Sequence, residues 1–102
     1  MADFRKGLHL IPEHMVEGVV RWIEWGLPPG DFLTALLSND LMGAFARADE
    51  QNAASMRGWA MFLYNYAPSE CYGSQAKVLA WSNAHAEARK LAKESPDAPT
   101  DF

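Results

Sequence analysis

Cysteine, long apolar runs and targeting signals are the features that this sequence has least of. Its single cysteine, Cys71, excludes a disulfide within the chain. No apolar run approaches the ~20 residues that a bilayer crossing requires, so the sequence predicts no membrane span. No signal peptide is visible, and a reducing cytoplasm is therefore the expected compartment.

Positive charge is also in short supply. Nine Lys and Arg stand against 13 Asp and Glu, which gives a net charge of -4. The basic residues are spread along the chain rather than gathered, so the protein as a whole repels a phosphate backbone. The composition therefore disfavours a nucleic-acid polymer as partner, although a pocket for one or two phosphates stays compatible with it.

Motifs for catalysis, metal binding and phosphate binding are missing. The sequence has no C-x-x-C, and no two histidines stand at i,i+4. The turn "GLPPGD" lacks both a Walker lysine and the G-x-G-x-x-G pattern. Cys71 has no recognisable nucleophile context, so we favour a buried or incidental thiol over one activated by His14 or His85. We expect no enzyme activity, no metal and no cofactor.

The sequence does contain enough apolar material for one packed core. Of its 102 residues, 49% are hydrophobic and only 22% are charged, a composition well away from that of disordered chains. A second core could not bury enough surface at this length. We expect a single domain over residues 1–94, followed by a mobile tail over residues 95–102, where Pro and Asp are frequent.

Apolar residues recur at helical spacing, and no segment alternates as a strand does. The segment from Ile11 predicts a helix that stops at Gly26, and a short helix should begin near Asp31. Ser74 is placed to cap a last helix. The predicted fold is all-α, an irregular bundle of four to five helices.

Residues 40–66 leave two possibilities open, one long helix or two helices with a break, and the residues around Asp49 favour the break. A single apolar stripe runs through the segment at steps of four and three, which is typical of one helical face. That stripe comprises Leu41, Phe45, Ala48, Asn52, Met56, Trp59, Leu63 and Tyr66.

Polar side chains gather in the middle of the sequence, beginning at a corner where Ser38 is the predicted N-cap. One interpretation makes these residues helix caps and internal hydrogen-bond partners. The other brings them together as a site for a small polar ligand. The candidate ligand-binding residues are Asn39, Asp40, Arg47, Asp49, Asn52, Ser74 and Trp81.

Four tryptophans and three tyrosines are many for a core of this size. They either fill the core or reach the surface, where they would contact a protein or stack on a ring. A large apolar content also predicts self-association, as a two-fold homodimer.

Several short motifs recur together over roughly residues 8–81: Ile11, Pro12, Gly18, Pro29 to Leu33, Ser38 to Leu41, Asp49, Asn52, Gly73 and Ser74. This pattern resembles that of a widespread family of small uncharacterised phage and prophage proteins. Trp22 stands where many members carry a tyrosine. The resemblance implies a compact cytosolic accessory protein in a bacterial host cell, used against host immunity.

Two functions follow as hypotheses. The first is a non-enzymatic protein that binds and sequesters a small, nucleotide-like signalling ligand. The alternative is an inhibitor or regulator that masks a host immune protein, such as a CRISPR component, through exposed Trp and Tyr.

Overall fold

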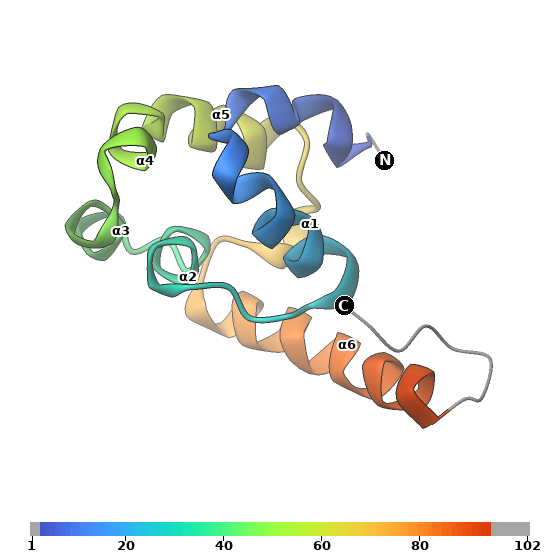
Figure 1. The fold of residues 1–102 in the computed structure, drawn as a ribbon. Helices are drawn as coiled ribbons and strands as arrows, with labels where there is room; N and C mark the ends of the chain where they lie inside the picture. The colour runs from blue at the N-terminus through green and yellow to red at the C-terminus, as the bar shows by residue number, and fades with distance from the viewer. Residues whose placement is uncertain (1–2, 95–102) are drawn as a thin grey trace.

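The computed structural model describes residues 3–94, and that part of the chain is all-α, as the sequence predicts (Figure 1). The expected tail, residues 95–102, lies outside the described residues. Three short 3₁₀ helices are η1 (Phe4–Leu10), η2 (Glu13–Met15) and η3 (Ser69–Cys71). The α-helices are α1 (Val16–Trp25), α2 (Asp31–Leu37), α3 (Leu41–Arg47), α4 (Glu50–Ala54), α5 (Met56–Asn65) and α6 (Gln75–Glu94).

The end of α1 follows the sequence prediction. Gly26 adopts a left-handed conformation with φ 63°, and its N–H donates back to the carbonyls of Arg21 and Trp22. A glycine in this conformation is the commonest way to stop a helix, because it has no Cβ to strain. The chain then runs through the two prolines and enters α2.

The corner between α2 and α3 differs from the prediction in its capping residue. Ser38 is not the N-cap; it ends α2, and Asp40 caps α3 by accepting a hydrogen bond from the Gly43 N–H at 2.9 Å. Asn39 makes the turn between them with φ 63°. Asparagine tolerates that conformation better than serine does, so the cap falls two residues further along, at Asp40.

Residues 40–66 break twice rather than once. The predicted break near Asp49 is confirmed, because Ala48 is extended and Asp49 caps α4. A second break at Ser55 separates α4 from α5, and the described part therefore holds six α-helices instead of four to five. Because the helices change direction, the predicted stripe does not form one face: Leu41 and Phe45 are exposed.

The core forms where α1, α2 and α5 meet, around the fully buried rings of Trp22, Trp59 and Phe62. Phe32 of α2 meets the Trp59 ring edge to face at 5.7 Å between centroids. The segment η1 packs on α5 so closely that a Cβ at Gly58 would overlap the backbone oxygen of Leu10. This packing covers the inner face of α5.

The last helix runs beneath α1 and α2 (Figure 1). Its 20 residues present Val78, Trp81 and His85 to the body, whereas Ala84 and Ala88 are exposed. Among the helices of residues 3–94, none is both long and apolar enough to span a membrane.

Candidate functional site

Helix α5 is apolar on both its faces. Apart from Arg57, Gly58 and Asn65, every residue in it is apolar or aromatic. Trp59, Phe62 and Leu63 are buried and supply the inner face. Helices with apolar residues all round are normally buried all round. The outer face of α5 is not, which makes this helix the first place to look for a binding surface.

The outer face of α5 borders a groove of about 650 Å³, which we call the α5 groove. Met56, Ala60, Met61 and Tyr64 line it from α5. Tyr64 is 82% exposed, so its ring stands almost free at the edge. The lining from the rest of the chain includes Leu36, Asn39, Leu41, Tyr72 and Gly73.

Helix α3 extends the apolar surface beyond the groove. Leu41, Met42 and Phe45 are all exposed, Met42 to 79%. Leu41 lines the groove, and Phe45 shares its helical face because the two are four residues apart. Among the described residues, five of the six exposed large apolar side chains belong to α3 or α5. Contiguous surfaces of this kind commonly mark contacts with other proteins.

Two of the predicted ligand-binding residues, Asp40 and Arg47, do lie together. They line a depression of about 370 Å³ between α2, α3 and the start of α6. Both, however, hold α3: Asp40 caps it, and the Arg47 guanidinium donates to the Gly43 carbonyl at 3.2 Å. Asn39 faces the α5 groove instead.

Asp49 bonds to a residue that the sequence prediction did not include in the site. One carboxylate oxygen accepts from the Asn52 N–H at 2.7 Å, and the other lies 2.9 Å from His14 Nε2. The Asn52 N–H and then His14 lower the pKa of Asp49, although partial desolvation opposes them. The pair joins η2 to the start of α4.

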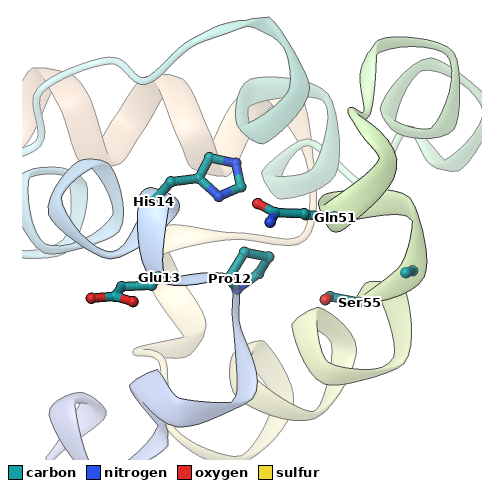
Figure 2. A pocket seen from close by; sticks show the side chains of 6 residues that line it. Pro12, Glu13, His14, Gln51 and Ser55 are labelled. Carbon is teal, nitrogen blue, oxygen red and sulfur yellow. The ribbon is translucent and has the colours of Figure 1, made fainter.

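A polar depression of about 600 Å³ lies beside that pair. Its lining includes Pro12, Glu13, His14, Gln51 and Ser55. Figure 2 shows the His14 ring and the Gln51 amide reaching toward each other from η2 and α4, while Glu13 turns away. Of the predicted residues, only Asp49 adjoins this depression, through its bond to His14.

The remaining predicted residues support the fold. Asn52 is buried, and its amide oxygen accepts from the Trp59 indole at 3.2 Å. Ser74 caps α6 by accepting from the Lys77 N–H at 3.1 Å. Trp81 donates its indole N–H to the Trp22 carbonyl at 2.9 Å. The seven predicted residues are thus distributed over several surfaces and the core, rather than gathered around one cavity.

The aromatic rings divide unevenly between core and surface. Trp22 and Trp59 are fully buried, and Trp25 and Trp81 are partly buried. Among the aromatic residues that the structure describes, Phe45 and Tyr64 are the exposed ones. Met61 and Tyr64 are not among the predicted site residues, although one signal was available in the sequence: the run "WAMFLY" is apolar at every position, which gives one helix two apolar faces.

Cys71 is buried next to the core, and burial raises the pKa of its thiol to about 12. A thiol in that state is a poor nucleophile at neutral pH, because only the thiolate reacts readily. Among the side chains that the structure describes, in residues 3–90, no three of His, Cys, Asp or Glu are grouped as a metal site would need.

Comparisons with known proteins add no family to these observations. No family model, no curated protein and no solved structure matches this chain. The resemblance to phage proteins stays a prediction, and the function has to be argued from the site geometry.

Proposed function

We propose that this protein is a non-enzymatic binding protein that holds another protein against the α5 groove. The observation that carries the proposal is the uncovered outer face of α5, next to the exposed apolar residues of α3. Covering Met61, Tyr64 and Leu41 would remove apolar surface from water, which is the main driving force of association.

The chemistry of the lining favours a protein partner over a small polar ligand. The amides of Asn39 and Asn65 are the main polar side chains, and methionines 56 and 61 offer flexible, polarisable contacts. Methionine side chains of this kind adapt to the surface of a partner. A nucleotide would instead need donors placed for its phosphates and base.

The biological setting stays a prediction. The resemblance to phage proteins implies that the partner is a host immune protein and that binding masks it in the bacterial cytoplasm. The α5 groove is compatible with such masking, since an inhibitor needs a surface rather than a reaction centre.

Site-directed photo-crosslinking in cells tests the proposal. A benzophenone-bearing residue would replace either Tyr64, beside the groove, or Leu79, an equally apolar exposed position on α6. We expect one defined protein adduct from position 64, none from position 79, and loss of the adduct when Met61→Asp is added. Equal labelling from both positions, or none from position 64, would refute the proposal.

A second candidate function rests on the polar depression shown in Figure 2. His14, Gln51 and Ser55 offer a ring nitrogen, an amide and a hydroxyl around it, which could orient a small polar ligand. A thermal-shift screen against signalling nucleotides tests this function. A rise in Tm that disappears in His14→Ala would support it, and no rise with any nucleotide would count against it.

A further inference from the structure

We infer that the occupant of the α5 groove is an amphipathic α-helix of the partner, with a carboxylate placed to meet Arg57. The inference rests on the proposed function and specifies the chemistry of the partner. Three features support it: the helical spacing of the outer face of α5, the second row of apolar residues on α3, and an arginine that has no partner among the described side chains.

The spacing on α5 is that of a helix which packs against another helix. Arg57, Ala60, Met61 and Tyr64 stand at i, i+3, i+4 and i+7 and are therefore on one face. Ala60 is small among larger neighbours, so a ridge of an incoming helix can enter beside it. Leu41 closes the lining from α3, and an incoming helix would contact both.

Arg57 places a positive charge at the edge of this face, and no described acidic side chain pairs with it. All five arginines lie in the described part of the chain, and four of them are bonded. Arg5 pairs with Glu24, Arg21 with Glu17, and Arg47 and Arg89 donate to backbone carbonyls. Arg57 makes no hydrogen bond or ion pair to any side chain among residues 3–90, the part of the chain whose side chains the structure describes.

A carboxylate on the partner would complement Arg57. Arg57 stands one turn before Ala60 and Met61, both of which line the groove. It also belongs to the first turn of α5, where the helix dipole adds positive potential. Charge pairs at the edge of an interface chiefly select the partner and speed association, while the apolar contacts hold it. An acidic amphipathic helix combines both properties.

A second copy of this chain fits less well. The exposed apolar helices that it could offer are α3, which carries Arg47 at its end, and α5, which carries Arg57 itself. The acid next to α3, Asp40, already caps that helix. A copy that inserted either helix would therefore bring positive charge, and not a free carboxylate, toward Arg57.

Fluorescence anisotropy with two labelled peptides tests the inference. Both are 15-residue amphipathic helices with Leu at i, i+3, i+4 and i+7. The positions that flank the leucines carry Glu in one peptide and Lys in the other, and all remaining positions are Ala. We expect the Glu peptide to bind about three- to fivefold more tightly in low salt. The difference should shrink as salt screens the exposed pair.

Matched variants separate charge from burial. Arg57→Glu should reverse the preference between the two peptides, whereas Lys90→Glu, the same charge change on exposed α6, should leave it unchanged. Met61→Asp should abolish the binding of both peptides, and Leu79→Asp should not. Circular dichroism on each variant checks that the fold is kept.

Failure of the inference and failure of the proposed function look different. Two outcomes would refute the acidic helix but keep the groove as a protein-binding site. In the first, both peptides bind equally and Met61→Asp abolishes the binding of both. In the second, neither peptide binds while the crosslink from position 64 persists. If sedimentation shows a dimer that Met61→Asp dissociates, the occupant is a second copy. If neither peptide binds and no crosslink forms, both ideas fall.

Discussion

Helices α1 and α5 have the same length, ten residues, and pack into the same core, yet the side chains that they expose to solvent differ in polarity. The outer face of α1 is charged: Glu17 pairs with Arg21 on the same helix, and Glu24 pairs with Arg5. The outer face of α5 instead exposes the large apolar side chains of Met61 and Tyr64.

That difference distinguishes a helix that only builds the fold from one that also presents a surface. Each helix buries a tryptophan completely, Trp22 in α1 and Trp59 in α5, so the inner faces contribute similarly to stability. Of these two helices, only α5 exposes large apolar side chains to solvent on its outer face. Mutations on the inner face of α5 should therefore lower the free energy of unfolding much more than mutations on its outer face do.

The largest effect should come from the inner face. Trp59→Ala removes a fully buried ring and should lower the free energy of unfolding by about 3 to 5 kcal/mol. Tyr64→Ala on the outer face should change it by no more than about 0.5 kcal/mol. Urea unfolding followed by circular dichroism measures both. Similar losses in the two variants would mean that the outer face belongs to the core.

A somewhat smaller effect should follow from Asn52→Ala, which deletes the acceptor for the buried Trp59 indole. An unsatisfied buried donor costs about 1 to 3 kcal/mol. The same unfolding experiment measures the loss. A control is Gln51→Ala, next to it in α4 and exposed, which should be near neutral. If Asn52→Ala is equally neutral, the amide has no structural role and regains its place as a ligand-binding candidate.

Glycines in the two helices give a third contrast, of opposite sign. Gly58→Ala in α5 would force a methyl group against the Leu10 backbone oxygen and should cost about 1 to 3 kcal/mol. Gly18→Ala in α1 meets nothing within 4 Å and should stabilise the protein by about 0.5 to 1 kcal/mol. Thermal melts resolve both, and a stabilised Gly58→Ala would show that η1 does not press on α5.

The fold could be predicted from the sequence where local chemistry decides it. Gly26, Asp49 and Ser74 end or begin helices through their own backbone or side-chain preferences, and the structure places them accordingly. Ser38 was assigned wrongly because two good capping residues stand two positions apart, and the left-handed turn at Asn39 decides between them. Such competition depends on the direction of the next helix.

The candidate site could not be predicted in the same way, because it depends on how the helices change direction at Ala48 and again at Ser55. In a helical pattern read straight through, Leu41 and Phe45 continue the buried stripe of Trp59, and nothing in that pattern marks them as exposed. Asn52 shows the reverse case: its need for a partner was clear from its position on the apolar face, but the partner, Trp59, follows only from the packing.

The smallest effect on stability should come from giving α5 the kind of outer face that α1 has. Met61→Glu places a carboxylate four residues after Arg57, so that the two can pair as Glu17 and Arg21 do. Exposed pairs at this spacing contribute about 0.2 to 0.5 kcal/mol, which offsets the apolar contact that Met61, 41% exposed, gives up, so the free energy of unfolding should stay within about 0.5 kcal/mol of wild type. Binding of the acidic peptide should be lost, because the apolar contact disappears and Arg57 is already neutralised. A melting temperature unchanged within about 4 °C, together with lost binding, is the expected result. A much larger fall would show that the outer face of α5 is needed to fold the chain, and the distinction between α1 and α5 would not hold.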